Sequence, residues 1–291
     1  MEPIRVAVRR GGTVESVHRV HAVGVRDGEV VAEAGERSLV TFFRSAAKPI
    51  QALLLVRARP GLDERLVAIA SASHHAEPEQ IEAVRALLDA APAAEDDLEC
   101  GPQEGRPPGR VYHNCSGKHA GFLAVCRSRG WETAGYRLPG HPLQQELLRE
   151  ITAAAGAEPA TATDGCGVVT FGLPLERMAT AFSRLAGLNG GARVLQAMRA
   201  HPQLVGGAES LDTRLMRALP GWVAKRGAEG LLCIGSPDGT GVVLKCEDGS
   251  ERALSPALAA FLPRLGHEAA EFARVPVENS RGDIVGEVAF P

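Results

Sequence analysis

The strand-like segments of this 291-residue sequence lie at its two ends, and helix-like segments fill the middle. Residues 4–43 alternate apolar and polar residues as strands do, and apolar runs with glycine-rich turns return over 222–246 and 284–289. Between them, segments such as 143–155 have apolar residues at helical spacing, with proline near the start and glycine after the end. This order predicts an α/β protein of the α+β type, in which a mixed sheet joins both termini around a helical middle.

The helix-like segments are separated by short turns and by one long loop. Residues 92–112 are rich in proline, glycine and acidic residues, which predicts that loop. No internal repeat, low-complexity tract or linker divides the chain, so residues 1–291 are expected to form one compact unit. Helices are predicted at residues 46–56, 64–72, 77–91, 118–129, 143–155, 175–185, 192–200, 211–218 and 256–265.

Charge and hydropathy argue against several classes of partner. The net charge of −3 gives no electrostatic reason to bind nucleic acid or an anionic membrane. No apolar run reaches the roughly 18 residues that a membrane span needs, and residues 1–10 alternate instead of forming a signal-peptide core. The six cysteines show no small-domain disulfide pattern, which fits a reducing compartment. A cytoplasmic protein with no nucleic-acid or membrane partner is therefore expected.

Lysine is rare in this chain. Of the 32 basic residues only four are lysine, namely Lys48, Lys118, Lys225 and Lys245. Arginine stays charged in a protein, whereas the pKa of a lysine shifts readily, so that its amine can act as a base or a ligand. The four lysine positions are therefore enriched in places where arginine would fail, although chance could account for any single one.

The segment Arg44–Lys48 carries a candidate nucleophile. Ser45 and Lys48 are spaced i, i+3, which on a helix places both side chains on one face. A serine hydroxyl needs a neighbouring base, and a lysine among apolar residues can serve because burial disfavours its ammonium form. Free N–H groups at a helix start can stabilise the resulting oxyanion. A helix cap beside a solvated charge is the alternative; the nucleophile interpretation predicts a hydrolase that works by acyl transfer.

Two further residues extend this pair. Ser73 lies beside two histidines between predicted helices, where it either contributes to an active site or caps the next helix. Lys245 lies near the end of an apolar strand, either as an outward-facing edge residue or as a buried functional amine. The order Ser45–Lys48, Ser73, Lys245 is similar to that of serine β-lactamases and penicillin-binding proteins. Because Ser-Asp-Asn is missing and Cys246 follows Lys245, a shared fold is expected but antibiotic hydrolysis is not.

A cysteine–lysine cluster is a candidate metal site. Cys115 and Lys118 share the i, i+3 relation in a glycine-rich turn, and Cys166 lies between two glycines in a second turn. Two thiolates and one amine nitrogen, with water in the fourth position, would form an open tetrahedral zinc site. Lysine is a rare ligand because it must first lose a proton. The alternatives are buried apolar cysteines, a reactive cysteine, or a phosphate-binding turn at Gly117-Lys118 that lacks the full P-loop spacing.

Taken together, these segments resemble the Rhizobium-type L-asparaginases of the asparaginase II family. They occur in family order and span most of the chain, and Cys115–Gly121 is the most specific of them. One departure is Ala76, where glycine is expected; it affects the shape of the Ser73 loop and with it substrate preference. The matching segments are Arg44–Gln51, Ser73-His74 with Glu77, His113–Gly121, Asp164–Gly167, His201-Pro202 with Val205–Gly207, Asp212-Thr213, and Lys245 before Asp248-Gly249.

The resemblance implies a β-lactamase-like fold, a homodimer, and one catalytic domain over residues 1–291 that hydrolyses L-asparagine to L-aspartate and ammonia. Ser45 would be the nucleophile, with Lys48 as its base. Ser73 and Lys245 would form a second pair that relays protons or activates water.

The resemblance also implies a metal ion beside the substrate. Cys115, Lys118 and Cys166 would hold zinc, which would position the substrate or activate water. Asp164 would orient a ligand or bind the amino group of the substrate.

Other functions are compatible with the same residues. A glutaminase or a broader amidase could use the same scaffold, and so could a zinc-bound amino-acid sensor without catalytic activity. A redox-active cysteine protein is a third alternative.

Overall fold

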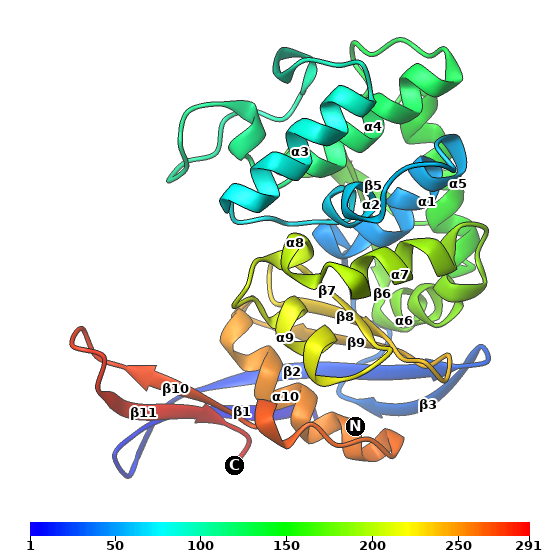
Figure 1. Ribbon diagram of the computed structural model, residues 1–291. Coiled ribbons are helices and arrows are strands. Elements are labelled where there is room, and N and C mark those ends of the chain that lie inside the picture. Colours follow the sequence, from blue (N-terminus) through cyan, green and yellow to red (C-terminus); the bar gives the residue numbers. More distant parts are fainter.

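The two ends of the chain pair in one antiparallel sheet in the computed structural model, which describes all residues, 1–291 (Figure 1). Its strands are β1 (Ile4–Arg10), β2 (Thr13–Arg26), β3 (Glu29–Ala34), β7 (Val223–Gly227), β8 (Leu231–Gly235), β9 (Gly241–Cys246), β10 (Arg274–Glu278) and β11 (Ile284–Ala289). They follow the order β10-β11-β1-β2-β9-β8-β7, and β3 also pairs with β2. The first and last strands of the chain, β1 and β11, are neighbours inside the sheet, with Ala7 opposite Ala289.

The predicted fold class is confirmed in its main features: strands from both termini form the sheet, and helices fill the middle of the chain. Every strand pairing is antiparallel, so the sheet itself is not of mixed direction. All residues of β8 and β9 are buried, which explains why these strands are continuous apolar runs and not alternating ones. Strand β10 was not predicted.

Nine of the ten α-helices fall on the predicted segments, and the short helix Pro202–Gly206 was not predicted. The helices α1–α5 form the upper part of the molecule in Figure 1, away from the sheet. The loop over residues 92–112 contains only two short 3₁₀ turns. No helix is both long and apolar enough to cross a bilayer. The helices are α1 (Lys48–Ala58), α2 (Glu64–Ala70), α3 (Pro78–Ala90), α4 (Ser116–Arg129), α5 (Pro142–Ala155), α6 (Leu175–Arg184), α7 (Gly191–Ala200), α8 (Pro202–Gly206), α9 (Leu211–Ala218) and α10 (Leu254–Phe261).

Helical segments cover the centre of the sheet on both faces. Gly241 of β9 pairs with Val25 of β2, so the preceding residue, Gly24, faces the opposite side from Gly241. A Cβ atom at Gly241 would lie 1.9 Å from the Ala179 carbonyl oxygen of α6. A Cβ atom at Gly24 would lie 3.0 Å from Leu265, in the 3₁₀ turn that follows α10. Backbone therefore packs against backbone where α6 crosses β9.

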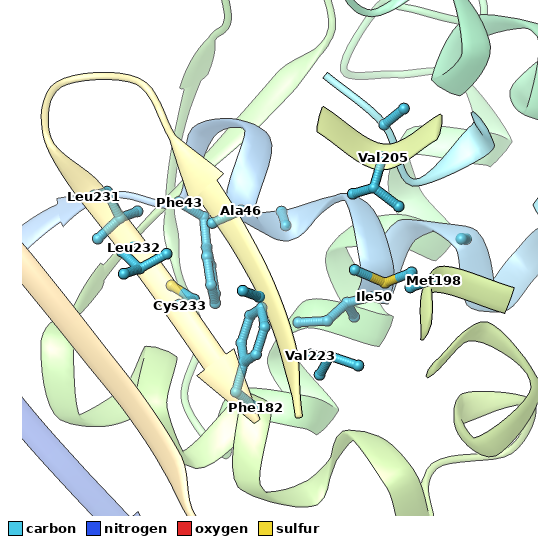
Figure 2. Close-up of a cluster of buried hydrophobic side chains, with 14 of the residues drawn as sticks. Phe43, Ala46, Ile50, Phe182, Met198, Val205, Val223, Leu231, Leu232 and Cys233 are labelled. Atoms are coloured by element: carbon cyan, nitrogen blue, oxygen red, sulfur yellow. The ribbon is translucent and has the colours of Figure 1, made fainter. Parts of the chain in front are cut away.

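A small second sheet lies directly before α1 in the chain, because its strand β4 leads into the turn that precedes this helix. It consists of β4 (Val40–Phe42), β6 (Val169–Pro174) and β5 (Ala160–Thr163), in the order β4-β6-β5. Phe43 and Ala46 follow β4 in the chain, and their side chains lie in the buried cluster of Figure 2 with Phe182, Val223 and Leu231. This cluster fixes the turn between β4 and α1 against the end of the large sheet.

Candidate active site

A polar cavity of about 210 Å³ lies where the turn before α1, the start of α9 and the end of β7 meet. Ala228 is the one apolar residue in its lining. The volume and the polar lining suit a small charged molecule better than an apolar ligand. The lining residues are Ser45, Ser73, His74, His75, Arg106, Asn114, Asp212, Lys225, Arg226, Gly227, Ala228 and Glu251.

Ser45 reaches this cavity from the 3₁₀ turn Arg44–Ala47, which joins β4 to α1. The Phe43 N–H group donates to β6 (2.8 Å), and Ala46 is buried in the core, so both sides of the turn are fixed. Directly before Ser45, Arg44 has a φ of +48°, a left-handed conformation that non-glycine residues rarely adopt. The Ser45 hydroxyl makes no hydrogen bond within the protein and is free to contact a bound molecule.

Lys48, fully buried at the start of α1, contacts the second predicted serine. Its amine donates to Ser73 Oγ at 2.9 Å and to the Ala72 carbonyl oxygen. No hydrogen bond joins Lys48 to Ser45, so the predicted i, i+3 pair is not a hydrogen-bonded one. The structure brings Ser45, Lys48 and Ser73 together, with Lys48 bonded to the serine that is distant in sequence.

His74 also lines the cavity, but both of its ring nitrogens are engaged. Nδ1 accepts from the Ala76 N–H (3.1 Å), and Nε2 lies 2.8 Å from Ser116 Oγ, which itself donates to the Val111 carbonyl oxygen. Nε2 therefore carries the proton and donates it to Ser116. Burial, and then the charge of Lys48, lower the pKa of His74 to about 3, so the ring is neutral. It serves as a structural link and not as a base for Ser73.

Lys225, which the sequence interpretation did not assign to the site, places a buried amine at the cavity. Its Nζ lies 3.5 Å from Asp212 Oδ2 and donates to the Arg226 carbonyl oxygen (3.0 Å). Burial lowers the pKa of Lys225 to about 8, although Asp212 opposes this shift by favouring the ammonium form. The rarity of lysine was the available signal, because Lys225 is one of only four.

The predicted pair of Ser73 and Lys245 is not formed in the structure. Lys245 Nζ donates to the Cys246 carbonyl oxygen, and its nearby charges are carboxylates such as Glu229 and Asp248. β9, which carries Lys245, is an inner strand between β2 and β8, whereas Lys225 belongs to the edge strand β7 beside the cavity. The position beside Ser45 and Ser73 is therefore filled by Lys225.

The predicted metal ligands Cys115, Lys118 and Cys166 are buried and in mutual contact. Lys118 Nζ lies 3.1 Å from Cys166 Sγ, and Cys166 is hydrogen bonded to Cys115. That hydrogen bond and nearby positive charges hold the pKa of Cys115 well below its usual value despite burial, whereas the pKa of Cys166 is raised. Two sulfur atoms and one nitrogen, with the Cys115 thiolate already favoured, are the donor types of a zinc site. Burial acts to lower the pKa of Lys118, but the two cysteines raise it overall, so its amine would have to give up a proton to join the set.

Asp164 is engaged within the protein by Arg44 and a backbone N–H group. Its Oδ1 accepts from Arg44 Nε at 2.6 Å and from the Gly165 N–H at 2.8 Å, and the residue does not line the cavity. The ion pair connects the turn that carries Cys166 to the residue before Ser45. Asp164 thus connects the turn that carries Cys166 to the turn that carries Ser45. Its contact with a substrate stays a prediction.

A second group of potential metal ligands lies outside the cavity. Ligand atoms of His18, Cys246 and Asp248 are all within 4.8 Å of one another. Hydrogen bonds already connect them, because His18 Nδ1 lies 2.6 Å and Cys246 Sγ lies 2.9 Å from the Asp248 carboxylate. Arg252 Nε donates to His18 Nε2, so the ring proton is on Nδ1, where a metal would bind. These contacts suit a hydrogen-bond network better than a bound cation.

Several solved structures are similar to this chain, all with TM-scores below 0.5. A crystal structure of Mglu in its native form has 14% identity and a TM-score of 0.48, covering 80% of this chain and 60% of that one. SurE with D-Leu has 14% identity and a TM-score of 0.44, covering 91% and 81%. A β-lactamase from Desulfarculus baarsii DSM 2075 has 16% identity and a TM-score of 0.37, covering 80% and 85%. This chain thus spans about 60% of the length of the Mglu chain.

Identities and scores this low concern the fold alone and say nothing about activity. No curated protein matches the sequence. The family comparison is extensive, because the model of the L-asparaginase II family matches residues 6–290, nearly the whole chain. The chain therefore belongs to the L-asparaginase II family, a family of amidohydrolases.

Proposed function

We propose that the protein hydrolyses the side-chain amide of L-asparagine to L-aspartate and ammonia through a covalent intermediate on Ser45. The observation that carries this proposal is the unbonded Ser45 hydroxyl in a small polar cavity that Ser73 and the buried Lys225 also line, with the buried Lys48 hydrogen bonded to Ser73. Membership in the L-asparaginase II family supports the class of substrate.

In this mechanism Ser45 Oγ attacks the amide carbonyl carbon, and its proton passes to the neutral amine of Lys225. Lys225 is assigned as the base, in place of Lys48, because burial lowers its pKa to about 8. When the C–N bond breaks, ammonia leaves with a proton delivered by Lys48 through Ser73, to which it is hydrogen bonded. Water then hydrolyses the Ser45 ester: Lys225 returns its proton to the departing Ser45 Oγ, and the proton lost by the attacking water restores the ammonium form of Lys48.

Two backbone N–H groups support stabilisation of the oxyanion. Ser45 and Ala228 line the cavity, and the N–H group of neither residue makes a hydrogen bond within the protein. Donors of this kind contribute about 3–4 kcal/mol each to transition-state stabilisation in other hydrolases. In this proposal one donor comes from the turn before α1 and the other from the residue that follows β7, so both elements have to meet at the cavity.

We further propose that Cys115, Lys118 and Cys166 hold a zinc ion. Their burial and mutual contacts, and the lowered pKa of Cys115, support this assignment. Bound zinc would supply a positive charge and a Lewis-acidic site near the substrate. A homodimer located in the cytoplasm also remains part of the proposal, on the family resemblance and the absence of disulfides among the six cysteines.

The proposal is tested by ammonia release from L-asparagine by the wild type and by Ser45→Ala. We expect turnover in the wild type and at least a thousandfold loss in the variant, since removal of a nucleophile leaves only the rest of the site. Thr240→Ser, at a buried hydroxyl that is not part of the cavity lining, serves as the control and should retain turnover. Absence of ammonia release by the wild type would contradict the proposal.

Other reactions on the same scaffold are separated by the choice of substrate. Initial rates on L-asparagine, L-glutamine and short peptides distinguish an asparaginase from a glutaminase or a broader amidase. If Ser45→Ala binds L-asparagine normally and the wild type never turns it over, the protein is instead an amino-acid sensor.

A further inference from the structure

The ion pairs within the cavity lining leave one cationic residue out. The basic residues of the lining, apart from its histidines, are Arg106, Lys225 and Arg226, and its carboxylates are Asp212 and Glu251. Arg226 pairs with both carboxylates, and Asp212 also lies 3.5 Å from Lys225 Nζ. Both acidic residues thus already have a cationic partner within the lining.

Arg106 is the cation that remains without an acidic partner. Its guanidinium donates to the His75 carbonyl oxygen and forms no ion pair with any aspartate or glutamate. A backbone carbonyl satisfies one donor of a guanidinium but does not neutralise its charge. Burial, and next the charges of Arg106 and Arg226, lower the pKa of His75, as expected for a positive potential on this side of the cavity.

The loop around Arg106 is fixed before any ligand binds. Gln103 accepts from the Arg106 N–H (3.2 Å) through its carbonyl and from the Asn114 N–H (2.8 Å) through its side chain, which ties the loop to the cavity wall. Pro107 and Pro108 follow and restrict the backbone on the other side. An arginine held in this way loses little conformational entropy on binding an anion.

We propose that Arg106 binds the α-carboxylate of the substrate, so that the enzyme acts on free α-amino acids and rejects molecules whose α-carboxyl group is blocked. This inference rests on the proposed function, because it places the side-chain amide toward Ser45 and the carboxylate toward Arg106. A guanidinium is the side chain best suited to carboxylate recognition, since it offers two parallel donors in a fixed plane. Arg106 is in this sense a specificity-determining residue.

The test compares two substrates, L-asparagine and L-asparagine α-N-methylamide, which releases ammonia only from its side chain. The wild type should prefer L-asparagine by roughly 10- to 100-fold in kcat/KM, the range expected for a charge-assisted hydrogen bond. Arg106→Gln should lose this preference through a raised KM for L-asparagine, with the methylamide unaffected. Arg106→Lys should keep part of it, and Arg85→Gln, an exposed arginine on α3, should behave as the wild type. Undiminished discrimination by Arg106→Gln would overturn the inference.

Calorimetric binding separates this inference from the proposed function. L-Asparagine and its methylamide are titrated into Ser45→Ala and into Ser45→Ala combined with Arg106→Gln. If no amide is hydrolysed by the wild type, but only the double variant loses its preference for L-asparagine, the catalytic proposal fails and the role of Arg106 stands. If hydrolysis occurs and both proteins bind the two ligands with the same relative affinity, the role of Arg106 fails alone.

Discussion

At the scale of single residues, the four lysines are the most informative positions. Their exposed fractions are 0% for Lys48, 3% for Lys118, 0% for Lys225 and 8% for Lys245, so all four are buried, although lysine is usually exposed. Arginine supplies the other 28 of the 32 basic residues and most of the exposed positive charge. The scarcity of lysine therefore did identify special environments, three of which lie in or near the site.

Lys225 gives a prediction about pH. If its neutral amine is the base, kcat/KM should rise about tenfold per pH unit up to about 8 and then level off. The charged groups that act on it are Asp212, which favours the ammonium form, and Lys48 and Arg226, which oppose it. Lys225→Arg should be inactive at every pH because arginine does not deprotonate. A flat pH–rate profile through pH 8, or an active arginine variant, would exclude this role.

Ala76 gives a prediction about stability. Its φ of +61° lies in the left-handed region, where glycine is favoured, and glycine is also what the family resemblance led us to expect at this position. Ala76→Gly should therefore raise the free energy of unfolding by up to about 1 kcal/mol, as measured by urea denaturation. Ala86→Gly, on an exposed face inside α3, is the control and should lower it by about 1 kcal/mol. Equal effects of the two substitutions would disprove the strain at Ala76.

At the scale of elements, the long periodic segments were predicted correctly, and two short elements, α8 and β10, were missed. The helix predicted at 143–155 is α5, which begins at Pro142 and ends before Gly156 in a left-handed conformation. α8 has only five residues, too few for a helical period, and β10 has five residues with Pro276 at its centre. Both exist because neighbouring elements supply their partners, such as β11 for β10.

The contact of α6 with β9 depends on the absence of a side chain at Gly241. In Gly241→Ala the added Cβ atom would lie 1.9 Å from the Ala179 carbonyl oxygen and 2.5 Å from the Ser183 nitrogen. Both are backbone atoms of the α6 segment, so the clash can be relieved only by a shift of the helix. We expect a loss of about 3 kcal/mol or more in the free energy of unfolding, determined by urea denaturation. Gly187→Ala, where nothing lies within 4 Å of the new Cβ, should change it by less than about 0.5 kcal/mol. A tolerated Gly241→Ala would mean that α6 packs less closely.

At the scale of the whole molecule, the site is assembled from segments that are far apart in the sequence. Ser45, Ser73, Asn114, Asp212 and Lys225 come from five separate segments and line one cavity. The cluster of Cys115, Lys118 and Cys166, which we propose as a zinc site, likewise joins α4 to the turn between β5 and β6. Neither the cavity nor the cluster of Cys115, Lys118 and Cys166 exists until the segments that contribute to it have folded against each other.

Zinc should stabilise the folded protein as a whole, because it would connect α4 to that turn. At a free zinc concentration of a hundred times Kd, the expected gain is about 2.7 kcal/mol, detected as a higher melting temperature. Cys115→Ala and Cys166→Ala should lose both the gain and the bound metal, as determined by elemental analysis. Cys246→Ala, in the second group of potential ligands, should retain both. Equal metal content in the wild type and Cys115→Ala would refute the assignment.

The sequence by itself determined the main elements, the two-ended sheet, and the residue types that carry chemistry, because these depend on local periodicity and on short motifs. It did not determine which lysine joins Ser45 and Ser73, since Lys225 and Lys245 both lie in apolar strands. Strand order decided this: β9 is enclosed by β2 and β8, whereas β7 is an edge strand whose Arg226 N–H is free to bond Asp212. Only the tertiary structure sets that order, because strand pairing depends on contacts between segments distant in the chain.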